Sequence, residues 1–172
     1  MRPRLPQASN GVFGRGIHIQ RGCTGPKCDP AAHASATIRG SLVESVYEMG
    51  ILAVNSTVRV EGTWVKATAP RAEGTFGDGV SAVDESSGLA QVNVAASRVE
   101  TAARAGISNF GGALSLGTTA IACSTFSLNG ENLGTSKFGF DDLGHNACGC
   151  PQAESRCTNV SVGLQPPELS NQ

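Results

Sequence analysis

The amino-acid sequence predicts an all-β domain of repeated strand–corner–strand units, arranged as a β-solenoid or as a β-sandwich or jelly roll. Three observations lead to this fold class: an eight-residue pattern recurs, the apolar residues are mostly small, and charges are few. Of the 172 residues, 16% are charged and 22 are glycine, against an average charged fraction of about 25%. Small side chains suit closely spaced sheets, whereas a helical bundle favours Leu, Glu and Lys.

The repeated pattern defines the elements of the predicted core. Each copy reads apolar, any, apolar, any, small, Ser or Thr, any, apolar. Four copies begin 22, 34 and 22 residues apart, namely ATIRGSLV (36–43), VRVEGTWV (58–65), VNVAASRV (92–99) and LSLGTTAI (114–121). A weaker fifth copy, FSLNGENL (126–133), begins 12 residues after the fourth. Such repetition is typical of one supersecondary unit stacked several times.

Each copy is predicted to form a strand, a corner and a second short strand. Val58 and Val60 share one face, because side chains alternate along a strand. Arg59 and Glu61 then share the opposite face. The small residue permits a turn, and the following Ser or Thr can bond free backbone groups. Trp64, in the second short apolar run, is expected in the core. Such units either stack as solenoid coils or fold back as the hairpins of a sandwich.

Three segments have signals beyond the repeat. Residues 41–50 and 95–106 contain good helix formers and end on Gly, so the sequence allows one short helix although the repeat runs through both. Residues 70–88 interrupt the repeat and are rich in Gly, Ser and acids, which predicts an acidic surface loop. Its acids do not match calcium-loop spacing, and we expect them in solvent: Asp78, Asp84 and Glu85.

The pattern divides the chain into three parts. A basic N-terminal arm with a C-x4-C loop covers 1–33, the repetitive β core 34–133, and a cysteine-containing C-terminal region 134–172. Residues 1–40 hold six basic residues and one acidic residue, while the remainder holds seven basic and thirteen acidic ones. The arm is therefore expected to lie on an acidic body, its own or that of a neighbouring subunit in a head-to-tail contact. The candidate assembly residues are Arg2, Arg4, Arg15 and Arg21.

Several partners are disfavoured by what the sequence lacks. The arginines of the arm form no run and no aromatic residues are interleaved with them, which argues against nucleic acid. No stretch approaches the apolar length of a membrane span. The basic start is not followed by the apolar segment of a signal peptide. We therefore expect copies of the same chain as the partner.

The six cysteines fall into two loops and one central position. Cys23 and Cys28 lie in the arm, Cys123 lies in the core, and the other three form C-G-C-x6-C near the end. An even number in loops around a core predicts disulfides, and Cys148 and Cys150 are too close to pair easily with each other. The alternative is zinc, with candidate ligands Cys23, Cys28, His145, Cys148, Cys150 and Cys157. The spacings depart from the paired C-x2-C of zinc ribbons, so no cofactor is expected on the disulfide interpretation.

No local motif indicates catalysis. The chain has no Gly-rich phosphate loop, no G-x-S-x-G and no H-E-x-x-H, so we expect a protein that is not an enzyme. The first hypothesis is a self-assembling structural subunit of an extracellular fibre, filament or virion, linked through the arm and strand edges. The second is a ligand-binding or adhesive β module contacting its partner through Trp64 and the 70–88 loop, which a core position of Trp64 weakens. The third is a small zinc or redox protein; a cytoplasmic location is the alternative because no signal peptide is visible.

Overall fold

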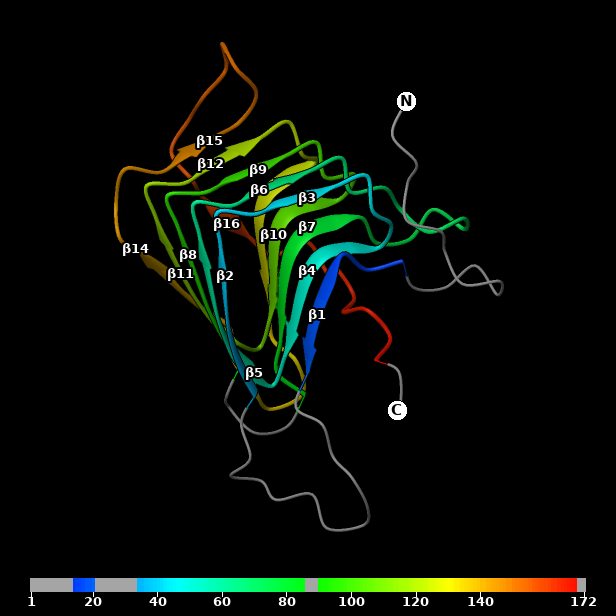
Figure 1. Cartoon of the computed structure of the whole chain (residues 1–172). Coiled ribbons are helices and arrows are strands. Elements are labelled where there is room, and N and C mark those ends of the chain that lie inside the picture. The colour runs from blue at the N-terminus through cyan, green and yellow to red at the C-terminus, as the bar shows by residue number, and fades with distance from the viewer. Residues whose placement is uncertain (1–13, 21–33, 86–89, 170–172) are drawn as a thin grey trace, which may run out of the picture.

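The described part of the chain is a stack of parallel β-coils. The computed structural model describes residues 14–20, 34–85 and 90–169. Their strands form three sheets in which every pair of neighbours is parallel and each turn of the chain adds one strand to each sheet (Figure 1). The all-β prediction is confirmed, and of the two predicted architectures the solenoid is observed. The short helix allowed at 41–50 or 95–106 is absent, since both segments are strands and corners.

The three sheets are named here A, B and C in the order in which the chain passes through them. Sheet A contains β1 (Ile17–Gln20), β4 (Met49–Val54), β7 (Asp78–Val83), β10 (Ala105–Phe110), β13 (Phe126–Glu131) and β16 (Asn159–Val160). Sheet B contains β2 (Ala34–Arg39), β5 (Ser56–Glu61), β8 (Gln91–Ala95), β11 (Ala113–Gly117) and β14 (Gly139–Asp142). Sheet C contains β3 (Leu42–Glu44), β6 (Trp64–Lys66), β9 (Arg98–Glu100), β12 (Ala120–Ala122) and β15 (Ala147–Cys148).

The four strong copies of the pattern are the corners between sheets B and C. In each copy the first strand lies in sheet B and the second in sheet C, and equivalent positions pair directly, as in Ala36 with Val58 and Val92 with Leu114. The small residue adopts the left-handed backbone conformation that glycine tolerates best. Its φ is 57° at Gly40, 54° at Gly62, 47° at Ala96 and 51° at Thr118; in the fifth corner His145 takes the same position, with a φ of 59°.

A ladder of side-chain oxygens links these corners from coil to coil. The backbone N–H of Thr63 donates to Ser97 Oγ (3.1 Å), that of Ser97 to Thr119 Oγ1 (3.4 Å), and that of Thr119 to Asn146 Oδ1 (2.9 Å). Each hydroxyl also donates to the carbonyl two residues before it, as Ser97 Oγ does to Ala95 O (2.7 Å). The Ser or Thr of the pattern therefore satisfies backbone groups that the corner removes from the sheets.

Two predicted segments are placed differently. The weak fifth copy is wrong as a corner, because 126–131 is β13 of sheet A; the fifth corner follows β14, whose Phe140 pairs with Leu114. The surface-loop prediction for 70–88 is wrong for 78–84. Those residues include the buried strand β7, and the side chains of Asp78 and Asp84 are 0% and 1% exposed. Asp78 is held inside the protein by Arg104 and Ser108, whereas Glu85 is exposed, as the sequence predicts.

The described coils extend beyond 34–133 in both directions, from β1 to β16. Inside the stack, apolar side chains of equivalent positions lie on one another. One such row in sheet C is Val43, Val65, Val99, Ile121 and Cys148. Burying rows of this kind removes apolar surface from water at roughly 25 cal/mol per Å², which makes stacking the main source of stability.

Sheet A is buried on both faces. Its outer side chains form a second apolar cluster of Met49, Leu52, Val54, Val83 and Phe110. Phe76 and two leucines of the C-terminal segment, Leu164 and Leu169, pack against this cluster. Figure 1 shows that segment, in red, on the side of sheet A away from sheet B. The double coverage explains why every residue of β4, β7 and β10 is buried.

Two buried carboxylates, Glu48 and Asp78, lie at the N-terminal ends of strands β4 and β7 in sheet A. Arg15 donates to Glu48 Oε1 from Nε (3.0 Å) and Nη2 (2.6 Å), and Arg71 Nη2 donates to the same oxygen (3.1 Å). Asp78 is held by Arg104, with Nε donating to Oδ1 (2.8 Å) and Nη2 to Oδ2 (2.5 Å). The Arg15 side chain is 4% exposed. Its charge is therefore paired with Glu48 inside the protein, while the role of the arm in assembly stays a prediction.

The ladder predicts that Ser97→Ala destabilises the protein. The change removes the acceptor of the Thr63 N–H, and an unsatisfied buried group costs ~1–3 kcal/mol. Urea unfolding followed by circular dichroism measures the loss. Ser41→Ala is the matched control, since Ser41 Oγ donates to Arg39 O at an exposed position, and it should cost under ~1 kcal/mol. Equal losses in the two variants would show that the ladder does not carry this energy.

Candidate functional site

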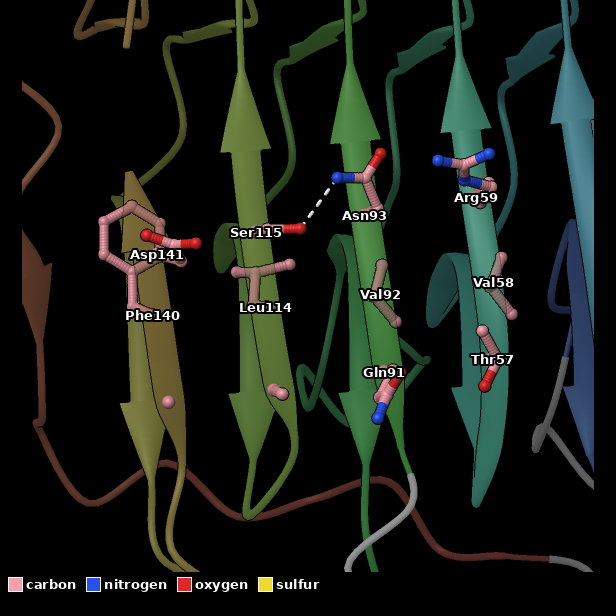
Figure 2. A pocket seen from close by; sticks show the side chains of 12 residues that line it. Thr57, Val58, Arg59, Gln91, Val92, Asn93, Leu114, Ser115, Phe140 and Asp141 are labelled. Atoms are coloured by element: carbon pink, nitrogen blue, oxygen red, sulfur yellow. Dashed lines mark hydrogen bonds between the residues drawn. The ribbon is translucent and has the colours of Figure 1, made fainter. Parts of the chain in front are cut away.

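The outer face of sheet B carries two parallel rows of side chains. One row consists of Thr57, Gln91, Ala113 and Gly139, and the other of Arg59, Asn93, Ser115 and Asp141. Members of a row come from neighbouring strands, which lie about 4.7–4.9 Å apart. The rows therefore run along the axis of the stack, across four coils (Figure 2).

A shallow groove lies along these rows. It has a volume of about 510 Å³ and spans β5, β8, β11 and β14. The residues between the rows, Val58, Val92 and Leu114, direct their side chains to the core. The row containing Gln91 ends in Ala113 and Gly139, whose small size leaves space beside Ser115 and Asp141. A further hollow of about 250 Å³, next to Ser35 and Thr37, continues over β2 and β5.

The groove offers hydrogen-bonding groups of both kinds. Asn93 Nδ2 donates to Ser115 Oγ (2.7 Å), which fixes the orientation of the amide (Figure 2). Arg59 and Asp141 lie at opposite ends of the same row, so their charges balance over the groove. The hydroxyl and amide groups between them are neutral. This arrangement suits a long polar ligand without a strong net charge.

Trp64 lies outside the core, which corrects the prediction. Its residue is 39% exposed on the outer face of sheet C, whereas Val65 is 1% exposed. Side-chain alternation resumes after the corner, and Trp64 occupies the unrestricted seventh position of the pattern, which points outward. Lys66 Nζ lies 4.2 Å from the ring centroid. Trp64 pairs in register with exposed Leu42, so these two residues and the groove occupy different sheets.

The four described cysteines form two disulfides. Cys123 pairs with Cys150, and Cys148 pairs with Cys157. Cys123 and Cys150 occupy equivalent positions on successive coils, each two residues after the paired Ile121 and Cys148. Cys148 ends an inward row of the core. The disulfides therefore fasten the last coil to its neighbour and close the loop that follows it.

The other predicted cysteine and arginine sites cannot be placed. Cys23, Cys28, Arg2, Arg4 and Arg21 lie outside the described residues. Cys148, Cys150 and Cys157 have disulfide sulfurs in this structure, and His145 occupies the left-handed corner position of the fifth coil. The described part of the chain contains no group of three or more His, Cys, Asp or Glu suited to a metal ion. The alternative of a zinc site drawn from the six candidate ligands stays a prediction, since two of them, Cys23 and Cys28, lie outside the described residues.

The groove was missed by sequence reasoning, although a signal for it exists. Position two of the pattern is unrestricted in character, yet it reads Thr37, Arg59, Asn93 and Ser115 in the four copies. All four are polar, and the stacking of the copies places them in one row. Asp141 extends the row from the fifth coil, where the sequence pattern is lost.

Comparison with known proteins provides no relative from which to transfer a function. No protein-family model, curated protein or solved structure matches the chain. No catalytic family is therefore indicated. Among residues 14–20, 34–85 and 90–169 there is no helix with the length and apolarity to cross a bilayer.

The position of the Cys123–Cys150 disulfide predicts a marked loss of stability when it is removed. For a separation of 27 residues, the loop-entropy estimate is roughly 3–4 kcal/mol. Unfolding of the Cys123→Ala, Cys150→Ala double variant in denaturant measures the loss. The difference from wild type should shrink in reductant, where both proteins lack the bond. Alkylation of Cys123 or Cys150 in the unreduced wild-type protein would contradict the assignment.

Proposed function

We propose that this protein is a non-catalytic binding module that holds an extended, neutral polysaccharide along sheet B. The observation that carries the proposal is the groove of about 510 Å³ that crosses four coils. Its polar row presents one hydrogen-bonding side chain per strand. The ligand-binding hypothesis from the sequence is thereby kept, with its contact surface moved from Trp64 and the 70–88 loop to sheet B.

The chemistry of the groove favours a saccharide over other extended ligands. A strand spacing of about 4.7–4.9 Å is comparable with the length of one sugar ring along an extended chain, so each coil can serve one ring. Asn93 and Ser115 provide an amide and a hydroxyl, which can exchange hydrogen bonds with sugar hydroxyls. The balanced charges of Arg59 and Asp141 do not favour a strongly charged polymer.

The number of carboxylates in the groove supports binding without cleavage. Glycoside hydrolysis generally requires two carboxyl groups facing each other across the scissile bond. Among the groove-lining residues, Asp141 is the one with a carboxylate. The disulfides favour an oxidising compartment, and an extracellular location, where polysaccharides are accessible, is part of the proposal.

Ala113→Trp should weaken saccharide binding by filling the groove. Titration calorimetry with neutral oligosaccharides of increasing length should show affinity rising until four coils are covered. The variant should bind about tenfold or more weakly, which corresponds to roughly 1.4 kcal/mol. Ala120→Trp, on sheet C of the same coil, is the matched control and should bind as wild type. Failure of wild type to bind any neutral oligosaccharide, or unchanged binding by Ala113→Trp, would refute the proposal.

Self-assembly is a second candidate, and the ends of the stack favour it. Among the described strands, β1 and β2 at one end and β14 and β16 at the other each pair with a single neighbour in sheets A and B. In sheet C, β3 has one neighbour, whereas Cys148 of β15 is also bridged to Ser155. Unpaired strand edges are templates for pairing with another chain. A head-to-tail contact between such ends would continue sheets A and B into a filament. Unlike the sequence hypothesis, this contact does not use Arg15.

Sedimentation velocity of the full chain tests this candidate. We expect oligomers that lengthen with protein concentration, because each added copy leaves a new free edge. Ser35→Lys with Thr37→Lys places charges on edge strand β2 and should hold the protein as a monomer. Thr125→Lys, at an exposed position between sheets C and A, should assemble as wild type. A wild-type protein that sediments as a monomer at every concentration would exclude assembly.

A further inference from the structure

The C-terminal segment 161–169 crosses the outer face of sheet A without joining any sheet. It follows β16 and contains no strand residues. Figure 1 shows it running from β16 past the outer side of the sheet toward β1. Residues of several coils contact the segment, among them Arg15, Arg104 and Glu131. None of these contacts replaces a hydrogen bond between strands. The segment therefore lies on the solenoid as a bound peptide would.

Glu131 holds the beginning of this segment. Its Oε1 accepts the backbone N–H groups of Val162 (2.8 Å), Gly163 (2.8 Å) and Leu164 (3.2 Å), and Ser161 Oγ donates to Oε2 (2.6 Å). Partial burial acts to raise the pKa of Glu131, but hydrogen bonds from Ser161, Asn129, Val162 and Leu164 outweigh it and lower the pKa. The carboxylate is thus kept ionised where it binds the peptide backbone.

Two arginines bind carbonyl groups farther along the segment. Arg104 Nη1 donates to the carbonyl of Gln165 (3.0 Å), and Arg15 Nη2 donates to that of Glu168 (2.5 Å). The carboxylate of Glu168 lies 3.5 Å from Arg71 Nη1. Buried Asp78 and Glu48 fix Arg104 and Arg15 from within. Such fixed donors lose little side-chain entropy when they bind a backbone.

Apolar contacts complete the surface. Leu164 and Leu169 pack on the outer cluster of sheet A. Pro166, Pro167 and Leu169 line a hollow of about 240 Å³ together with Val83 and Leu133. The prolines favour an extended backbone before binding, which reduces the entropy cost of ordering the segment.

We propose that the outer face of sheet A is a second binding site, specific for an extended proline-containing peptide, and that residues 161–169 are its internal ligand. The recognised chemistry is a leucine, two central prolines, an acidic residue and a second leucine, with two carbonyls directed at arginines. The site is independent of the groove on sheet B. Side chains in or beside sheet A, and no strand hydrogen bonds, hold the backbone of this segment. The segment can therefore be released without opening a sheet.

The test uses the full chain with Leu164→Asp and Leu169→Asp, which releases the segment. A fluorescent peptide of residues 161–172 is titrated into this variant and into wild type. The variant should bind saturably, and wild type about tenfold or more weakly, because the tethered segment competes at high effective concentration. A peptide carrying the same two aspartates should not bind. Equal binding of both peptides, or no binding by a variant that keeps its β-sheet spectrum, overturns the proposal.

Two further measurements keep the test decisive. Adding Arg104→Met to the released variant should weaken peptide binding, whereas Arg98→Met on sheet C should leave it unchanged; equal effects count against the site. If the released variant does not fold, hydrogen exchange on wild type decides. Amides of 162–164 should exchange through a local opening while those of β7 remain protected. Exchange of both only through global unfolding would mean that the segment is part of the core and not a ligand.

Discussion

The fold depends on the corner between sheets B and C. There the chain leaves one sheet and enters the next through a left-handed residue, so a backbone N–H loses its sheet partner. The hydroxyl of the adjacent coil accepts that N–H, as Ser97 does for Thr63 and Thr119 does for Ser97. Because each corner needs the next coil to complete it, coils must stack in register. The apolar rows inside and the polar rows outside both follow from this register.

The register also divides the surface into faces with different uses. Side chains that point outward from sheets B and C do not pack in the core, so they can contact a ligand. The row from Arg59 to Asp141 is an example. Sheet A is different because its outer residues are apolar and covered. Its charged groups, Glu48 and Asp78, are buried beneath arginines that in turn bind the C-terminal segment. One solenoid thus carries an open polar face and an occupied apolar one.

The sequence allows the corners to be predicted because they need both a tolerant residue and a hydroxyl. That signal weakens where other residues meet the same need: His145 takes the left-handed position and Asn146 replaces the hydroxyl, so the fifth corner was misplaced. Asp78 was assigned to solvent since its partner Arg104 lies 26 residues away. The groove forms only when strands of neighbouring coils pair in register. One copy of the pattern does not show which strands become neighbours. The cysteine pairing needs the same knowledge, because Cys123 meets Cys150 through coil register.

The segment after β16 also connects the two edges of sheet A, because Glu168 reaches Arg15 beside β1. From β16 to β1 there are five steps across sheet A, or about 24 Å at the usual strand spacing. The eight residues from 161 to Glu168, which reaches Arg15, span at most roughly 26–29 Å when extended. The N–H groups of 162–164 all reach one oxygen of Glu131, so this part of the segment is curved and not fully extended. The long Arg15 side chain therefore supplies part of the distance. Through this contact a segment of nine residues connects the last coil of sheet A with the first. Extension of the Arg15, Arg71 and Arg104 side chains toward the segment is thus an alternative to lengthening the segment itself.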